Sequence, residues 1–550
     1  MNHFQSGLDT VKFCINNKLS HRQPWEIVLM SSTTVLTVTW LWDFIFKDES
    51  LYGRLQRFVF SMVKKIPAVR RKIESELETM RTSFNDSNLK RFKGQTFIVE
   101  LPTESKSPDE VLSMFYANMK LGEYDWKNGF VSGTVYYKEN EDIMNTLTEI
   151  SRVSSYSNPL HIDVFPGVCK MEAEVIKMCT KLFHGGPKAC GSITTGGTES
   201  IMMACKAYRD YGAATHNISR PHMVVPITAH PAFDKAASYF RMRIKHVRCD
   251  PHTTAVDLRA MERAITSNTC MLVASAPNYP YGTCDDVAAI AELGLKYNIP
   301  VHVDCCLGGF LTAFMPAAGF PLQPFDFALP GVTSISADTH KYGFAPKGSS
   351  VVMYSDPKYH KHQFCVTTEW PGGVYGSPSV CGSRSGGTIA SCWAVLMLYG
   401  FDGYVKSTKR IIETSRYIES ELRKIDEIFI FGKPMTSVVA LGSNSFHIYS
   451  LSESLSEKGW NLNPLQFPVG VHLCVTDMHT KEGIADRFIT DVRESVTEIM
   501  KNPPTKPMGK MAVYGMAQSI PDRSIVDDAT RLFISSMYYT PHNDTSHDNN

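Results

Sequence analysis

The most constraining feature of this sequence is segment 334–343, which reads Ser-Ile-Ser-Ala-Asp-Thr-His-Lys-Tyr-Gly. Its first residues are small or β-branched and predict the end of a buried strand. Lys341 comes shortly after that strand, beside a histidine, an aromatic residue and a glycine, which is not the pattern of a solvated helix face. A desolvated lysine amine is partly deprotonated and forms Schiff bases with carbonyl compounds. Alone, the segment is equally compatible with a surface lysine at a strand-to-loop boundary, because short motifs also occur by chance.

Two upstream segments favour the chemical interpretation. Asp304 ends the apolar run of segment 301–304, and a buried carboxylate is unfavourable unless it has a cationic or hydrogen-bonding partner. The pyridinium nitrogen of pyridoxal 5'-phosphate (PLP) is such a partner. Segment 194–200, Thr-Thr-Gly-Gly-Thr-Glu-Ser, precedes an apolar helical run and offers free N–H groups to a phosphate. A phosphate site, an aspartate and a lysine, each at the end of an element, together predict a PLP site.

These motifs resemble those of the PLP-dependent group II decarboxylase-like enzymes of fold type I. Within that group, the closest resemblance is to the family of sphingosine-1-phosphate lyases, and it runs from roughly residue 100 to 515. Further matching segments are Ser157–His161, Phe165–Gly167, Ala204–Asp210, Ala345–Ser350 and Gly459–Asn463. The resemblance implies an α/β fold, the PLP-dependent transferase fold type I. Its large domain has a mostly parallel seven-stranded sheet flanked by helices, followed by a smaller C-terminal α/β domain.

The order of apolar segments agrees with that fold class. Strands are expected at Met223–Ile227, Cys270–Ser275, Pro300–Asp304, Val332–Ala337 and Ser350–Tyr354, and helices at Glu172–Phe183 and Asp286–Tyr297. Such alternation predicts a sheet with helices on both faces, which binds ligands at the C-terminal ends of its strands. After a helix at about Ala390–Tyr399, strands are expected at Ser437–Leu441 and Val471–Thr476, and a helix at Ile484–Met500.

These patterns divide the chain into six expected regions. They are a short lumenal tail (1–25), a transmembrane helix (26–46), a connector and N-terminal segment (47–165), a large PLP-binding domain (166–400), a small C-terminal domain (401–515) and a partly disordered tail (516–550).

Composition excludes some functions and sets the compartment. A hydrophobic content of 43% and a charged content of 20% are typical of a globular body, and a net charge of +1 gives no nucleic-acid footprint. The 14 cysteines are scattered without zinc-ligand spacing, which favours reduced thiols in a cytosol-facing protein and no metal site.

An N-terminal apolar segment predicts one membrane span. Ile27–Phe46 is just long enough to cross a bilayer as a helix, and Trp25, Trp40 and Trp42 lie near its ends. A buried core helix or a signal peptide is the alternative. More lysines and arginines follow the span than precede it, so the enzyme body is expected to face the cytosol. The resemblance implies a single anchor in the endoplasmic reticulum membrane.

The resemblance also implies roles for individual cofactor residues. Lys341 would hold PLP as a Schiff base, and Asp304 would pair with the pyridine nitrogen. Gly197 and Thr198 would bind the phosphate. The remaining candidates are His340 as a further phosphate donor, His230 as the histidine that stacks on the ring, and Gly386, in the loop Arg384–Gly387, which would close the phosphate site from the neighbouring subunit of a homodimer.

Substrate residues follow from the same resemblance. Tyr136, His161 and Lys347 match positions implied in substrate-phosphate binding or proton transfer, so Tyr136, His161, His230 and Lys341 are the catalytic candidates. Asn158 and Tyr279 are weaker candidates. Tyrosine and histidine are also common as wall residues without a chemical role.

The implied activity is that of a PLP-dependent aldehyde-lyase of the sphinganine-1-phosphate aldolase type. It would cleave phosphorylated sphingoid bases by retro-aldol chemistry to a long-chain fatty aldehyde and phosphoethanolamine, the degradative exit of sphingolipid metabolism. An amino-acid decarboxylase shares fold and cofactor and is the alternative. A membrane-tethered scaffold with an inactive PLP fold is a third possibility. The expected partners are the lipid substrate, the bilayer and a second copy that shares the active sites.

Overall fold

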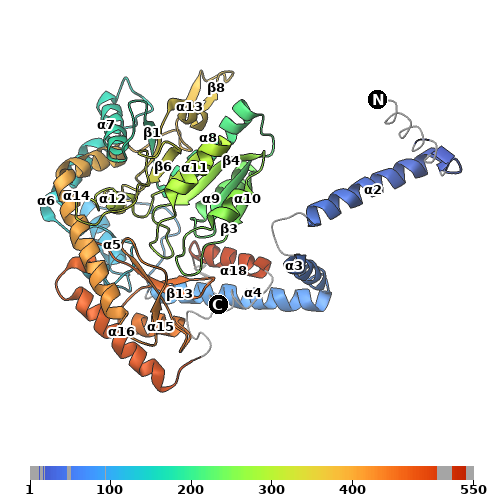
Figure 1. Cartoon of the computed structure of the whole chain (residues 1–550). Coiled ribbons are helices and arrows are strands. Elements are labelled where there is room, and N and C mark those ends of the chain that lie inside the picture. Colours follow the sequence, from blue (N-terminus) through green and yellow to red (C-terminus); the bar gives the residue numbers. More distant parts are fainter. Residues whose placement is uncertain are drawn as a thin grey trace. The chain divides into compact units, whose positions relative to one another are not determined.

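The chain forms two compact units. The computed structural model describes residues 12, 16–17, 19–45, 51–92, 95–504 and 523–540. Unit 1 combines residues 1–106 with 519–550, and unit 2 is Ser107–Gln518. Figure 1 shows the central sheet of unit 2 with helices packed around it.

A seven-stranded sheet organises unit 2. Its strands are β1 (Cys190–Thr194), β2 (His222–Pro226), β3 (Arg243–Val247), β4 (Thr269–Ser275), β5 (Val301–Asp304), β6 (Val332–Ala337) and β7 (Ser350–Tyr354). The order is β1-β7-β6-β5-β4-β2-β3. Strands β3, β2, β4, β5 and β6 pair in parallel, whereas β7 runs antiparallel to both β6 and β1. The expected mostly parallel sheet of seven strands is therefore confirmed.

Both faces of this sheet are covered, because alternate residues of a strand point to opposite sides. Leu272 and Ala274 of β4 belong to one apolar cluster, while Met271 and Val273 belong to a second. The first cluster includes residues of α7 (Pro166–Leu182), α11 (Val287–Tyr297), α12 (Gly309–Thr312) and α14 (Gly386–Leu422). The second includes residues of α8 (Gly197–His216) and α9 (Ala232–Phe240).

A second, antiparallel sheet follows in the same unit. Its strands are β10 (Phe429–Ile430), β11 (Val438–Gly442), β13 (Gly470–Cys474) and β12 (Asn463–Leu465), with α15 (Tyr449–Glu457) and α16 (Ile484–Lys501) beside it. The helix expected at Ala390–Tyr399 is only the first part of α14, which continues to Leu422 past a non-helical residue, Gly400. The remaining elements of unit 2 are α5 (Pro108–Met119), α6 (Glu141–Ser154), α10 (Leu258–Ala264), α13 (Pro357–His360), β8 (Cys365–Thr367), β9 (Tyr375–Ser377) and 3-10 turns at Trp126–Asn128, Lys361–Gln363 and Asp477–Thr480.

Unit 1 is helical: α2 (Pro24–Ile45), α3 (Leu51–Val63), α4 (Pro67–Arg91) and α18 (Arg523–Ser536). Helix α18 joins the two ends of the chain, since the buried Asn88 of α4 donates from Nδ2 to the Ser536 carbonyl at 2.8 Å. Phe84 and Phe533 meet edge to face with ring centroids 5.6 Å apart. No helix was expected within the tail 516–550, of which residues 516–522 and 541–550 lie outside the described part.

The expected span corresponds to α2, although Phe46 lies outside the described residues. Within the described part of the chain, the helix that is long and apolar enough to cross a membrane by length and composition is α14. Ile389, Ile411 and Ile418 of α14 are buried in the main core, so α14 is a core helix of unit 2.

Candidate active site

A glycine loop leads from β1 into α8 and leaves the start of that helix uncapped. Gly196 precedes α8, and no side chain caps it. The Glu199 carboxylate instead accepts hydrogen bonds from the Thr195 N–H and hydroxyl, both at 2.7 Å, and so fixes the loop. A Cβ at Gly197 would lie 2.8 Å from both Asp338 carboxylate oxygens and from Cys306 Sγ. Only glycine therefore allows this approach, and the first turn of α8 presents free N–H groups to an anion.

Asp304 lies at the C-terminal end of β5, as predicted. His302 and Asp304 are two residues apart and so share one face of the sheet. Asp304 is buried, and its Oδ1 accepts hydrogen bonds from the Cys306 N–H at 2.9 Å and from the Ser336 hydroxyl at 3.3 Å. Its other oxygen has no hydrogen-bond partner among the described residues. The carboxylate is thus held in place from one side only.

Lys341 lies four residues after β6, and its ammonium forms an ion pair that the sequence analysis did not foresee. Nζ lies 2.8 Å from Oδ2 of Asp338, which is almost fully buried. Burial alone would lower the pKa of Lys341, but the Asp338 carboxylate outweighs it and raises that pKa. Burial likewise opposes ionisation of Asp338, yet Lys341 and His340 hold its pKa well below the usual range. The expectation of a partly deprotonated lysine is therefore wrong for this structure, because a carboxylate neutralises the desolvated charge.

One cavity of about 320 Å³ brings most of the predicted cofactor residues together. Gly197, Thr198, His230, His340 and Lys341 all line it. His230 follows β2, and its Nδ1 accepts the Ala232 N–H at 3.1 Å. Desolvation lowers the pKa of His230, which keeps its ring neutral near neutral pH. Asp304 does not line this cavity; Cys306, whose N–H it holds, does.

The residues of this cavity fit PLP. The amine of Lys341 can bond to its aldehyde carbon, and the uncapped start of α8 can bind its phosphate. A buried oxygen of Asp338, Oδ1, has no hydrogen-bond partner and lies where Gly197 comes closest. Such an orphaned atom is unfavourable in an apolar core and is typical of a site completed by a ligand or water.

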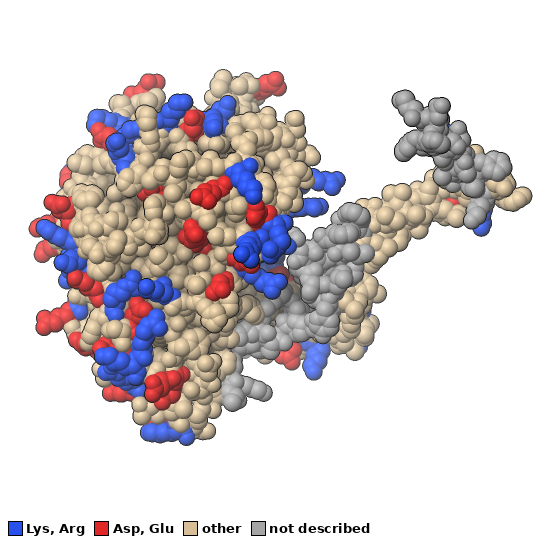
Figure 2. Space-filling model, in the orientation of Figure 1, with Lys and Arg blue, Asp and Glu red and all other residues tan. Residues whose placement is uncertain are grey.

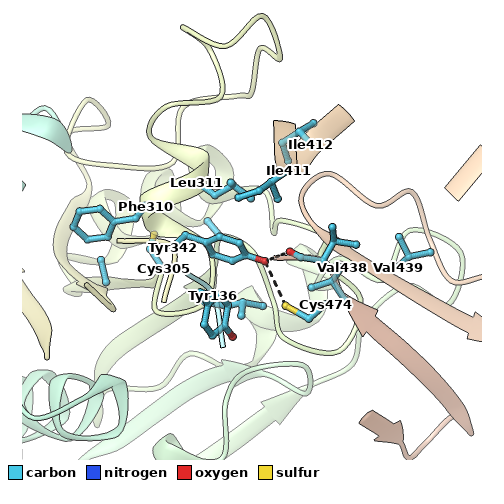
Figure 3. Close-up of a cluster of buried hydrophobic side chains, with 14 of the residues drawn as sticks. Tyr136, Cys305, Phe310, Leu311, Tyr342, Ile411, Ile412, Val438, Val439 and Cys474 are labelled. Carbon is cyan, nitrogen blue, oxygen red and sulfur yellow. Dashed lines mark hydrogen bonds between the residues drawn. The ribbon is translucent and has the colours of Figure 1, made fainter. Parts of the chain in front are cut away.

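Two further candidates lie together near the second sheet. The Lys347 ammonium is 5.1 Å from the centre of the Tyr136 ring, a cation–π distance. Partial desolvation and the Lys341 charge lower the pKa of Lys347, although the residue keeps contact with solvent. Tyr136 is buried and meets the Tyr342 ring edge to face at 4.8 Å. Figure 3 shows the Tyr342 hydroxyl directed at Cys474 of β13, so this tyrosine joins the Lys341 loop to the smaller sheet.

The remaining candidates form a separate group. Asn158 and His161 lie on the loop between α6 and α7, and Gly386 begins α14. The Gly386 N–H donates to the Ser157 carbonyl at 2.9 Å, and the Arg384 N–H donates to Asn158 Oδ1 at 3.2 Å. These contacts hold the two loops against each other. None of the three candidates lines the cavity that contains Lys341. Tyr279 does not line it either, and its ring packs against His472 at 4.8 Å.

Sequence reasoning missed Asp338, Cys306 and Glu199. The signal for Asp338 was present, because it directly follows a buried strand and lies three positions before Lys341. Asp304 was identified from a similar position, at the end of a buried strand. No periodicity marks the other two: Cys306 reaches the cavity from the loop after β5, and Glu199 reaches it from the first turn of α8.

The chain is similar to characterised proteins over nearly its whole length. The family described as the pyridoxal-dependent decarboxylase conserved domain matches residues 99–442. A sphingosine-1-phosphate lyase of Drosophila melanogaster is 57% identical over 98% of this chain and 99% of its own length. Sphingosine-1-phosphate lyase 1 of Rattus norvegicus is 49% identical over 96% of this chain and 92% of its own.

Solved structures agree with this similarity. The sphingosine-1-phosphate lyase of Burkholderia pseudomallei superimposes with a TM-score of 0.72 at 40% identity, covering 74% of this chain and 94% of that one. A glutamate decarboxylase of Lactobacillus brevis superimposes with a TM-score of 0.64 at 20% identity, covering 74% of this chain and 96% of that one. At this low identity the likeness shows a shared fold alone. The PLP-fitted cavity and these similarities lead to one assignment: the chain belongs to the pyridoxal-dependent decarboxylase family and, within it, to the PLP-dependent sphingosine-1-phosphate lyases.

Proposed function

We propose that this protein cleaves phosphorylated sphingoid long-chain bases of the sphingosine 1-phosphate type between C2 and C3. The products are a long-chain fatty aldehyde and phosphoethanolamine, which makes the reaction the degradative exit of sphingolipid metabolism. The observation that carries this proposal is the 57% identity with the Drosophila lyase over nearly the full length of both chains. The decarboxylase alternative rests on a much more distant likeness, which supports the fold only.

The cofactor roles follow from the cavity. Lys341 would hold PLP through Nζ, the first turn of α8 at Gly197 and Thr198 would bind its phosphate, and His340 would add a donor. The carboxylate of Asp304 would face the pyridine nitrogen with the oxygen that has no protein partner. When bound, PLP supplies an electron sink for the pair released as the C2–C3 bond breaks.

The chain's own residues would handle the protons. The substrate's 3-hydroxyl must lose a proton as its carbon becomes the aldehyde, and C2 must gain one. Tyr136 keeps its proton, because burial raises its pKa well above the usual range, and therefore suits hydrogen-bond donation. His230 is neutral, and because its Nδ1 accepts the Ala232 N–H, its Nε2 carries the proton and can donate a hydrogen bond. Its ring would lie against the cofactor ring. His161 remains a candidate for the same proton transfers, supplied from the loop between α6 and α7.

Product analysis tests the reaction. Purified enzyme given a phosphorylated long-chain base should release a long-chain aldehyde and phosphoethanolamine, both detected by mass spectrometry. The same enzyme should release no carbon dioxide from glutamate or tryptophan. Carbon dioxide without aldehyde would replace the proposal with the decarboxylase alternative.

A homodimer with shared active sites would explain why the candidates form two groups. Asn158, His161 and Gly386 would then complete the cavity of the partner. The segment around them exposes an unusual number of large apolar side chains: Val153, Tyr156, Leu160, Ile162 and Val164. Apolar surface of this kind marks an interaction site.

Mixed dimers test the shared site. Lys341→Ala and His161→Ala chains should each be inactive alone. When co-expressed, they should regain a measurable fraction of activity, because one mixed site receives both intact residues. A mixture as inactive as either parent would place each site within a single chain.

We infer also that α2 anchors the protein in the endoplasmic reticulum membrane, with the catalytic unit on the cytosolic side. Its 22 residues correspond to about 33 Å, close to the hydrocarbon thickness of a bilayer. Its described atoms carry almost no charge (Figure 2), and Val35, Leu36 and Trp40 are exposed. Deleting residues 1–46 should give an active enzyme that no longer fractionates as an integral membrane protein. A truncated chain that stays in the membrane would contradict the assignment of the anchor.

A further inference from the structure

Helix α3, which follows the proposed anchor, has one apolar face that the described structure leaves exposed. Leu55, Phe58, Val59 and Met62 are 55%, 47%, 50% and 51% exposed. Counted from Leu55, spacings of three, four and seven residues place these four side chains on one side of the helix. The apolar surface of α3 is therefore one-sided, unlike that of α2, where exposed apolar side chains occur throughout the helix.

On the opposite side of α3, Phe60 is half-buried and a neighbouring lysine contacts α18. Lys64, one residue beyond α3, donates a hydrogen bond to the Ser524 hydroxyl of α18. In helical projection Ser61 also lies away from the apolar row. The exposed apolar row therefore lies on the side of α3 away from the contact between Lys64 and α18.

The segment is strongly and uniformly basic. Residues 51–72 contain no aspartate or glutamate, and they contain Arg54, Arg57, Lys64, Lys65, Arg70, Arg71 and Lys72. This concentration stands out in a chain whose net charge is only +1. A polybasic segment beside a membrane span is attracted to the anionic lipids of the cytosolic leaflet, at about 1 kcal/mol per basic residue near the surface.

The covalent link restricts what can cover the apolar face. Helix α2 ends at Ile45 and α3 begins at Leu51, so only residues 46–50 connect them. Even a fully extended connection of that length reaches about 20 Å. If α2 crosses the bilayer, the start of α3 cannot leave the neighbourhood of the lipid headgroups.

From these observations we propose that α3 lies in the membrane–water interface, with its apolar row in the acyl boundary and its basic residues on anionic headgroups. This rests on the anchor proposed above for α2. The partner is a lipid surface that contains anionic lipid, because the row is apolar, the flanks are basic and the tether is short. A second copy of the chain or another protein on the same face would be a different outcome of the test.

Photo-crosslinking in the full-length protein tests this directly. A photoreactive amino acid is placed at Phe58 or, as the matched control on the opposite side, at Ser61. The protein is reconstituted in phosphatidylcholine vesicles with or without phosphatidylserine. Lipid adducts should form several-fold more at Phe58 than at Ser61, and phosphatidylserine should raise the Phe58 yield. Equal yields at the two positions, or protein adducts at Phe58, would overturn the proposal.

A charge variant and an extraction assay separate this inference from the anchor. Replacing Arg54, Arg57 and Lys65 by glutamine should reduce the Phe58 yield in phosphatidylserine vesicles to its level in phosphatidylcholine; an unchanged yield would remove the role of anionic lipid. Alkaline carbonate extraction of the same samples reports on α2 alone. Loss of the Phe58–Ser61 difference in carbonate-resistant protein rejects the α3 proposal and leaves the anchor intact. A chain that carbonate extracts rejects the anchor, whatever the crosslinks show.

Discussion

The central sheet and the N-terminal helices use the same apolar residue types in opposite ways. Leu272, Val303 and Ile335 of the sheet are fully buried, and polar residues that follow β6, among them Asp338 and Lys341, line one cavity. In unit 1, Leu36 and Phe58 are exposed, as are the apolar side chains of Val35 and Val59 beside them. The difference shows that an apolar segment defines a protein core only when other segments of the chain supply its partners. An apolar segment without such partners contacts a different environment, which for α2 and α3 is proposed to be lipid.

Among the changes considered for the cavity beside the central sheet, removal of Lys341 should have the largest effect on turnover. Lys341→Ala should abolish turnover and the visible absorbance of the lysine-bound cofactor, because no other amine lines the cavity among the described residues. Circular dichroism should show an unchanged fold. Lys361→Ala, an exposed lysine, is the control. Turnover above background in Lys341→Ala would remove this residue from the mechanism.

Asp304→Asn tests the strand-end carboxylate with little change in shape. The amide can still accept the Cys306 N–H, so the fold should persist, but the charge that would keep the pyridine nitrogen protonated is lost. We expect kcat to fall at least about 100-fold, which is about 2.7 kcal/mol. Steady-state kinetics and a melting curve measure the two effects. Near-normal kcat would make Asp304 structural.

Low pH should reduce the stability of unit 2, which contains the central sheet, but not the contact between α4 and α18 in unit 1. Burial lowers the pKa of His302 to about 4, from an ordinary value of 6.5. Between these two pH values His302 is protonated in the unfolded chain and neutral in the folded chain. The free energy of unfolding therefore decreases as the pH falls through this window, by about 3 kcal/mol for His302. Urea unfolding at pH 7 and pH 5 measures the part of this loss that occurs above pH 5, which is about 2 kcal/mol. His302→Asn should lessen the slope and the exposed control His252→Asn should not; equal slopes in the two variants would contradict the argument.

Lys347→Ala tests the cation beside Tyr136. Loss of a charge-assisted contact to the substrate phosphate should lower kcat/KM by about 2–3 kcal/mol, while cofactor binding stays normal. Lys347→Arg, which keeps the charge, should recover part of the loss. Unchanged kcat/KM in the alanine variant would leave Lys347 as a loop residue without a role in substrate choice.

The smallest effect is expected in unit 1. Asn88→Ala removes the side chain that donates to the Ser536 carbonyl at 2.8 Å and to its hydroxyl at 3.1 Å. Amide-exchange protection in α18 should fall by about 1 kcal/mol, with turnover unchanged. Ser87→Ala, at an exposed neighbouring position, should change neither. A loss of turnover in Asn88→Ala would show that unit 1 affects the active site.

Predictions from the sequence were most accurate for strands in which every residue is buried. The bounds expected for Val332–Ala337 and Ser350–Tyr354 are those observed, because both strands are covered on their two faces by other elements. It was least accurate where the decisive contact is distant in sequence. Helix α14 was expected too short, because the Gly400 region interrupts its apolar pattern. The ion pair of Lys341 with Asp338 required the geometry of a loop, which no periodicity encodes.

The contact between α4 and α18 has a consequence for synthesis. Asn88 and Ser536 are 448 positions apart, so the ribosome completes α4 long before its partner helix exists. At about 5–20 residues per second, the delay is roughly 20–90 s. Throughout that interval the side of α4 that bears Phe84 and Asn88 has no α18 to cover it, while the catalytic unit is already emerging. A prematurely terminated chain would keep that side uncovered, and cellular quality control could distinguish it from a finished one by this difference.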